Sequence, residues 1–117
     1  MAKIAISSEG PSLDDLVDPR FGRAGGFLLV DSGDLSAAYL DNGAAQARGQ
    51  GAGIQAAELV ARAGATVVLT GYVGPKAFQA LRAAGIGIGQ DLGGLSAREA
   101  LRRFLEGQVP LAQAPNR

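Results

Sequence analysis

The segment ATVVLT, residues 65–70, is an unbroken run of apolar and β-branched residues between two stretches of helical periodicity. A strand that is apolar on both faces is typical of the centre of a sheet covered by helices on both sides. Helices that connect such strands make right-handed crossovers and leave the strands parallel. This run therefore predicts an α/β protein and disfavours an all-helical or an all-strand fold.

The other periodic segments complete the sheet and its helices. Strand patterns lie at 3–8, 26–31, 35–41 and 86–88, and helical patterns lie at 53–63, 75–84 and 97–105. Ser96 and Glu99 have the S-x-x-E spacing of a capping box at the start of the last helix. The element order βββαβαβα predicts a five-stranded mixed sheet in one domain, residues 1–107, followed by a flexible tail, residues 108–117.

The predicted strand directions bring the long loops together. A hairpin joins the second and third strands, and helical crossovers make the first, fourth and fifth strands parallel. The connections at the carboxyl edge of these strands are the long, glycine-rich ones, residues 9–25, 42–53, 71–75 and 89–95. Because loops on a rigid scaffold commonly carry function in α/β proteins, we expect a binding site at this edge.

Composition excludes several classes of function. The 11 basic and 11 acidic residues cancel, so no overall field would attract nucleic acid or an anionic membrane. The chain has no cysteine and no histidine, which excludes thiolate or imidazole metal ligands and Ser-His or Cys-His nucleophiles. It has no apolar run of membrane-spanning length and no signal-peptide pattern. We therefore expect a cytoplasmic protein with no nucleic-acid or membrane partner.

The segment GQGAGIQAAELV fits the dinucleotide fingerprint G-x-G-x-x-G/A through Gly51, Gly53 and Ala56. A dinucleotide loop, however, joins a strand directly to its helix, and an acidic residue follows on the next strand. Here residues 42–50 separate the motif from the preceding strand, and ATVVLT ends without an acid. Two interpretations remain. Either the glycines only let a loop turn into a helix, or the N–H groups of the helix N-terminus bind a compact anion.

The segment TGYVGPKAF repeats this arrangement at the same edge. The buried strand leads through Gly71 and Gly74, and Lys76 lies in the first turn of the following helix. The helix dipole and the ammonium group would both favour an anion there. The alternative is an ordinary loop between strand and helix, with a solvated lysine.

The segment DPRFGRAGG lies at this edge too, between the first and second strands. Arg20 and Arg23 flank Phe21 and Gly22, which places two guanidinium groups beside an aromatic ring. The alternative is that Phe21 fills the core and Asp18 pairs with one arginine in a structural turn. Three such loops at one edge favour the binding interpretation.

The segments VDPRFGRA and GAGIQAAELVARAGATVVLTGYVGPKAFQALRAAGI, in this order, resemble the dinitrogenase iron–molybdenum cofactor biosynthesis family. The resemblance covers residues 3–106 and implies a ribonuclease-H-like three-layer α/β domain that binds, carries or protects anionic metal–sulfur clusters. Size and lack of cysteine are similar to the orange protein subgroup, which holds a molybdenum–copper sulfide cluster non-covalently. Some relatives carry His or Cys before the first helix, and NGAAQARGQGAG has neither, so the resemblance implies no side-chain metal ligand here.

The loops and the resemblance together predict a non-enzymatic binder, carrier or scaffold. Its ligand would be an anionic molybdenum-containing sulfide cluster of the molybdenum–copper or iron–molybdenum type, and a protein would donate or accept that cluster. The predicted site residues are Arg20, Phe21, Gly22, Arg23, Arg48, Gly51, Gly53, Ile54, Gly71, Gly74 and Lys76. Two other hypotheses remain: a phosphate- or nucleotide-binding module that uses the same edge, and a protein-interaction adaptor.

Overall fold

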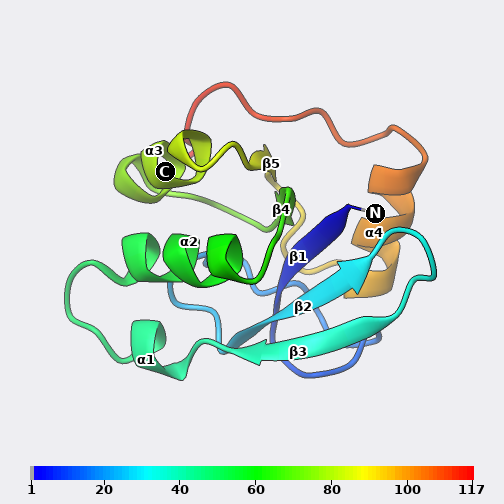
Figure 1. Ribbon diagram of the computed structural model, residues 1–117, viewed down its shortest axis with the longest axis horizontal. Helices are drawn as coiled ribbons and strands as arrows, with labels where there is room; N and C mark the ends of the chain where they lie inside the picture. The colour runs from blue at the N-terminus through cyan, green and yellow to red at the C-terminus, as the bar shows by residue number, and fades with distance from the viewer. Residues whose placement is uncertain (1) are drawn as a thin grey trace.

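A five-stranded mixed sheet forms the centre of the fold in the computed structural model, which describes residues 2–117 (Figure 1). The first residue of the predicted domain therefore lies outside the described residues. Across the sheet the strands follow the order β3-β2-β1-β4-β5. Their bounds are β1 (Lys3–Ser8), β2 (Gly26–Asp31), β3 (Ala37–Asp41), β4 (Val67–Leu69) and β5 (Gly87–Gly89).

Helices cover both faces of this sheet, which confirms the predicted three-layer α/β class. They are α1 (Gly43–Gln46), α2 (Ala52–Arg62), α3 (Pro75–Ala83) and α4 (Ala97–Leu105). The predicted order βββαβαβα lacked α1, because a helix of four residues is too short to produce a periodic pattern. No helix within residues 2–117 has the length and apolar character needed to cross a membrane.

Strand β1 lies in the middle of the sheet and separates two hydrophobic cores. Ala5 belongs to the core beneath α2 and α3, whereas Ile4 and Ile6 belong to the core beneath α4. All three side chains are almost completely buried. The alternation follows from the strand period of two, which sends successive side chains to opposite faces. In Figure 1, α2 and α3 accordingly lie on one side of the sheet and α4 on the other.

The strand pairing brings the long loops to one edge, as predicted. Strand β1 pairs antiparallel with β2 and parallel with β4, and β4 pairs parallel with β5. The loops that follow β1, β3, β4 and β5 therefore share the carboxyl edge of the sheet. The first of them is fixed against the third, because the Tyr72 N–H donates to Pro19 O at 2.7 Å and the Phe21 N–H donates to Tyr72 O at 3.3 Å. These backbone hydrogen bonds thus hold the loops after β1 and β4 in fixed positions relative to each other.

The capping box at α4 forms in part. Ser96 Oγ accepts a hydrogen bond from the Glu99 N–H at 3.1 Å, as expected. The Glu99 carboxylate does not return to the Ser96 N–H, because it bonds to the guanidinium groups of Arg102 and Arg103. Two charged partners on the same helix outcompete one neutral N–H donor.

The C-terminal segment runs along the outer edge of β5 (Figure 1, red end). The Ala112 N–H donates to Ile88 O at 2.7 Å. A Cβ added at Gly87 would lie 2.9 Å from a methyl group of Leu111, so the tail packs directly onto the strand. The domain boundary expected at residue 107 stays a prediction, but Val109, Leu111 and Ala112 pack on or bond to β5.

Candidate functional site

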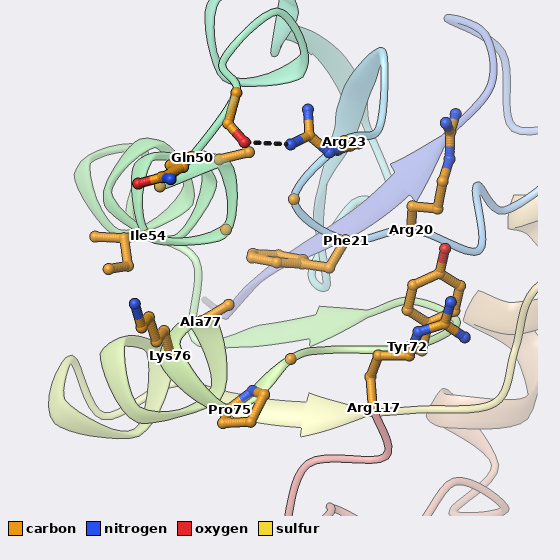
Figure 2. A pocket seen from close by; sticks show the side chains of 16 residues that line it. Arg20, Phe21, Arg23, Gln50, Ile54, Tyr72, Pro75, Lys76, Ala77 and Arg117 are labelled. Atoms are coloured by element: carbon orange, nitrogen blue, oxygen red, sulfur yellow. Dashed lines mark hydrogen bonds between the residues drawn. The ribbon is translucent and has the colours of Figure 1, made fainter.

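A cavity of about 540 Å³ opens at the carboxyl edge of the sheet, where the N-termini of α2 and α3 meet the loop after β1 (Figure 2). Four separate stretches of the chain contribute to it. Its lining consists of Arg20, Phe21, Gly22, Arg23, Gly49, Gln50, Gly51, Ala52, Gly53, Ile54, Tyr72, Gly74, Pro75, Lys76, Ala77 and Arg117. The structure thus brings together nine of the eleven predicted site residues, all except Arg48 and Gly71.

Glycines allow the three loops to approach this closely. A Cβ added at Gly53 would lie 2.8 Å from the Ala77 Cβ, and one added at Gly22 would lie 2.8 Å from the Gly53 Cα. Real side chains essentially never come so close. The close packing of the N-termini of α2 and α3 against the arginine loop, the segment of residues 18–26, therefore depends on these glycines. The fingerprint glycine Gly53 is therefore a packing residue at the junction of three segments.

Both helices present uncapped N-termini at the cavity. The N-cap residues are Gly51, with a left-handed φ of 76°, and Gly74, which is extended. Neither supplies a side-chain cap. The N–H groups in the first turn of each helix therefore lack intrahelical acceptors. Pro75 is the exception, because proline has no N–H group. Two helix dipoles add partial positive charge to the same place.

Basic side chains surround the cavity. These are Arg20, Arg23, Lys76 and Arg117, and no aspartate or glutamate of residues 2–117 is part of the lining. In Figure 2, Lys76 and Ile54 lie on one side of the Phe21 ring, and Arg20, Tyr72 and Arg117 lie on the other. A chain of zero formal net charge thus concentrates positive charge at one edge.

Arg20 is partly occupied by an internal partner. Its Nε lies 3.3 Å from Asp18 Oδ1, and the carboxylate is 5% exposed against 47% for the arginine side chain. The Asp18 carboxylate also accepts the Arg20 backbone N–H at 3.0 Å. The hydrogen bond and the charge of Asp18 raise the pKa of the Arg20 guanidinium. The structural turn considered for this segment therefore exists, and it holds Arg20 at the cavity while reducing its effective charge.

Arg23 fixes the loop between α1 and α2. Its guanidinium donates to the backbone oxygens of Gln46, Arg48 and Gly49, at 3.2, 2.6 and 3.1 Å. Because these acceptors are neutral carbonyls, the guanidinium keeps its charge while it closes one side of the cavity. Arg23 is thus both a cationic group of the lining and a structural anchor of the loop that precedes α2.

Lys76 differs from both arginines. Its ammonium makes no hydrogen bond or ion pair with any of residues 2–117, and the side chain is exposed. A lysine without an internal partner, beside an uncapped helix N-terminus, has its full charge for a ligand. Of the four predicted cationic residues, Lys76 is the one that makes neither an ion pair nor a side-chain hydrogen bond within residues 2–117.

The floor of the cavity is aromatic. Phe21 is 1% exposed and its ring lies 5.3 Å from that of Phe27, so it fills the core as the alternative interpretation proposed. Its outer surface nevertheless belongs to the cavity lining. Ile54, which is 40% exposed, lies on the opposite wall. A buried ring and an exposed aliphatic side chain give the cavity apolar surface between its basic groups.

Arg48 and Gly71 do not line the cavity. The Arg48 Nε donates to Gln50 O at 2.9 Å, which turns the guanidinium back onto its own loop. Gly71 packs against Pro19, since an added Cβ would lie 2.5 Å from the Pro19 Cα. Both residues support the surrounding loops, and their predicted part in binding stays a prediction.

The sequence analysis did not predict seven residues of the lining, Gly49, Gln50, Ala52, Tyr72, Pro75, Ala77 and Arg117. Of these, Tyr72 and Arg117 contribute an aromatic ring and a charge. Tyr72 lies between Gly71 and Gly74 in the TGYVGPKAF segment, for which only the glycines and Lys76 were predicted to bind. Arg117 lies in the tail, where no periodic pattern indicates a contact. Its guanidinium carbon is 4.1 Å from the centroid of the Tyr72 ring. The position of Arg117 was not predictable from local sequence.

Within residues 2–117, no cluster of side chains is suited to direct ligation of a metal ion. The described residues contain no group of three or more His, Cys, Asp or Glu side chains that could hold a metal ion. Since the chain also lacks cysteine and histidine, the arrangement offers cationic groups, backbone N–H donors and apolar surface. This chemistry fits an anion of more than atomic size.

Comparisons with known proteins show the family of this chain and several relatives. The sequence model described as "Dinitrogenase iron-molybdenum cofactor" matches residues 1–107. The apo form of the orange protein from Desulfovibrio gigas is 62% identical, with a TM-score of 0.98 over 100% of this chain and 98% of that one. A putative NifB protein from Thermotoga is 31% identical, with a TM-score of 0.84 over 100% and 98%. An uncharacterized protein from Methanocaldococcus jannaschii is 27% identical over 93% of this chain and 90% of its own length.

Proposed function

The chain belongs to the dinitrogenase iron-molybdenum cofactor family, and from this premise we propose that it carries an anionic molybdenum-containing sulfide cluster as cargo. The cluster would bind in the cavity between α2 and α3 without bonds between protein atoms and metal. The similarity to the orange protein supports a cofactor-binding or carrier role. Molybdenum, with copper as the second metal, is the composition that we propose for testing.

One observation carries the proposal: four basic side chains and two uncapped helix N-termini line a single cavity, to which no aspartate or glutamate of residues 2–117 contributes. A cavity with this lining binds anions, because both the fixed charges and the N–H dipoles favour negative charge. Its volume of about 540 Å³ exceeds what one phosphate or sulfate needs and lies within the range of cofactor sites.

The lining also favours a particular kind of anion. Phe21, Ile54 and Ala77 contribute apolar surface between the basic groups. A small oxyanion is strongly hydrated and loses water at high cost, whereas a large sulfide cluster spreads its charge over polarizable atoms. With no cysteine or histidine in the chain, the cluster must bring its own sulfide ligands. The protein then supplies charge, N–H donors and shape.

We also propose that the protein acts without catalysing a reaction. Among the described residues, the cavity lining has no aspartate, glutamate, cysteine or histidine side chain to serve as nucleophile or general base. The cavity opens at the loop-rich edge, so a second protein could deliver or accept the cluster there. A donor or acceptor protein is therefore the expected partner.

The test is a titration of apo protein with tetrathiomolybdate, with and without copper, under anaerobic conditions. Bands in the visible spectrum should develop and should elute with the protein in gel filtration. The matched control is Arg62→Ala, which removes one exposed positive charge at the far end of α2. Retention of the bands by a variant that lacks Lys76 and Arg23, at the level of this control, would overturn the proposed location.

A competition experiment separates the cluster from phosphate, the ligand of the alternative hypothesis. The uncapped N-termini of α2 and α3 would accept a phosphate as well as a sulfide cluster. We expect millimolar inorganic phosphate, at constant ionic strength, to leave bound tetrathiomolybdate in place. Displacement at or below the concentration of the thiomolybdate would instead identify a phosphate- or nucleotide-binding module.

A further inference from the structure

The last residues of the chain return to the carboxyl edge of the sheet. The Gln90 side chain donates to Ala114 O at 2.9 Å, and Asn116 lies beside the loop that connects β4 to α3. Its Oδ1 accepts the Val73 N–H at 2.9 Å, and its Nδ2 donates to Gly71 O at 3.0 Å. Residues 114–116 are thus held by hydrogen bonds at both ends.

Asn116 uses both ends of its amide group. It pairs with a backbone donor and a backbone acceptor two residues apart, and its Nδ2 also donates to Asp91 Oδ1 at 2.9 Å. These contacts bridge the loops after β4 and β5, which lie 45 and 25 residues away in sequence. An amide that satisfies two backbone groups at once resists replacement by a smaller side chain.

This anchoring determines where Arg117 lies. The guanidinium carbon is 4.1 Å from the centroid of the Tyr72 ring, within the range of a cation–π contact. Arg117 makes no ion pair with any of residues 2–117, and it lines the same cavity as Lys76. In Figure 2 it stands next to Tyr72, across the cavity from Lys76. Its guanidinium therefore lies at the cavity without an aspartate or glutamate partner among the described residues.

We propose that Arg117 contacts the anion in the cavity and that Asn116 is its positioning residue, so that docking of the C-terminal segment completes the binding site. This inference rests on the proposed function and assigns one of its four basic side chains, Arg117, to a strap, which is the C-terminal segment of residues 108–117. Linkage makes the effect reciprocal. An anion that binds the docked form more tightly stabilises the docked strap by the same free energy.

The experiment measures the dissociation constant of tetrathiomolybdate for the full chain at fixed ionic strength. Arg117→Ala should weaken binding about tenfold, the effect of losing one charge-assisted contact. Arg117→Lys should fall between this variant and the wild type, because lysine keeps the charge but stacks less well on Tyr72. Two control variants, Arg62→Ala and Gln113→Ala, should bind as the wild type does. Gln113 is a tail residue whose side chain makes no hydrogen bond within residues 2–117.

A double-mutant cycle tests whether Asn116 acts through Arg117. Asn116→Ala should weaken binding, and the double variant should bind no more weakly than Arg117→Ala alone. A merely structural asparagine would add its full effect in the double variant, and such additivity would overturn its positioning role. The Val73 amide, which donates to Asn116, provides a second measurement. Its hydrogen exchange should slow on addition of tetrathiomolybdate in the wild type and remain unchanged in Arg117→Ala.

The outcomes separate this inference from the proposed function. Loss of affinity in Lys76→Ala with wild-type affinity in Arg117→Ala would overturn the role of the strap and leave the cavity as the site. A wild-type protein that binds no tetrathiomolybdate would overturn the proposed function and the inference together. A tenfold loss in Arg117→Ala with native folding by circular dichroism supports both.

Discussion

Gly53 and Ala77 bring the N-termini of α2 and α3 into contact, since a Cβ on the glycine would lie 2.8 Å from the Cβ of the alanine. The same glycine faces Gly22 of the arginine loop. Both helix dipoles are therefore directed to one cavity, and the distance between them depends on the absence of one methyl group. Gly53 forms part of a sequence pattern associated with nucleotides, yet its measurable role here is close packing.

The first prediction concerns this contact. Gly53→Ala should destabilise the protein by about 1–3 kcal/mol, as overpacking does, despite the better helix propensity of alanine. The variant should also bind tetrathiomolybdate more weakly, because the two N-termini move apart. Denaturant unfolding and the visible titration provide the two measurements. The control is Gly49→Ala, whose added Cβ would meet no atom within 4 Å and should change stability by less than about 0.5 kcal/mol.

The second prediction ranks two basic residues by their internal partners. Lys76→Ala should weaken anion binding about tenfold and leave the free energy of unfolding within about 0.5 kcal/mol, because no described residue pairs with it. Arg20→Ala should weaken binding and also cost about 1–2 kcal/mol of stability, since it leaves the buried Asp18 carboxylate without its guanidinium. Equal stability of the two variants would contradict this assignment. Chemical unfolding of the apo proteins makes the comparison.

The third prediction concerns the start of α4. Ser96→Ala should lower stability by about 1 kcal/mol, because the Glu99 N–H loses its side-chain acceptor. Affinity for tetrathiomolybdate should remain that of the wild type, since neither residue lines the cavity. A Ser96→Ala variant that loses the ligand but not stability would show that the site has been assigned to the wrong surface.

The fourth prediction is a pH dependence on the same helix. Hydrogen bonds from Arg102 and Arg103 lower the pKa of Glu99 from 4.5 to about 2. A carboxylate with a depressed pKa in the folded state stabilises the protein above its unfolded pKa and loses that contribution as pH falls. The stability gap between wild type and Glu99→Gln should therefore be largest near neutral pH and should shrink between pH 4.5 and 2. A gap that grows on acidification would have the wrong sign.

Much of the fold follows from local pattern. The strands and long helices lie within a few residues of their predicted positions, because apolar periodicity and terminal glycines report burial directly. The strand directions and the loop-rich edge followed from the order of elements alone. The short helix α1 was not predicted, because its four residues span barely one turn and produce no periodic pattern.

The functional edge was less predictable at the level of single residues. Sequence reasoning selected the three loops, but it did not reveal that Arg23 would hold the carbonyls of its neighbouring loop or that Arg48 would turn away. Each outcome depends on a backbone oxygen whose position is set by packing. A charged side chain has several rotamers of similar energy, and its final partner decides among them.

The amino-acid sequence by itself determined the α/β class, the direction of the strands and the absence of any thiolate or imidazole ligand, because these depend on periodicity, connection and composition. Only the tertiary structure decided which basic groups share one cavity. It brought Arg117 from the tail to Tyr72 and placed Gly53 against Ala77. These contacts join residues far apart in the chain, and their energy comes from complementary shape and fixed backbone donors, which no local pattern encodes.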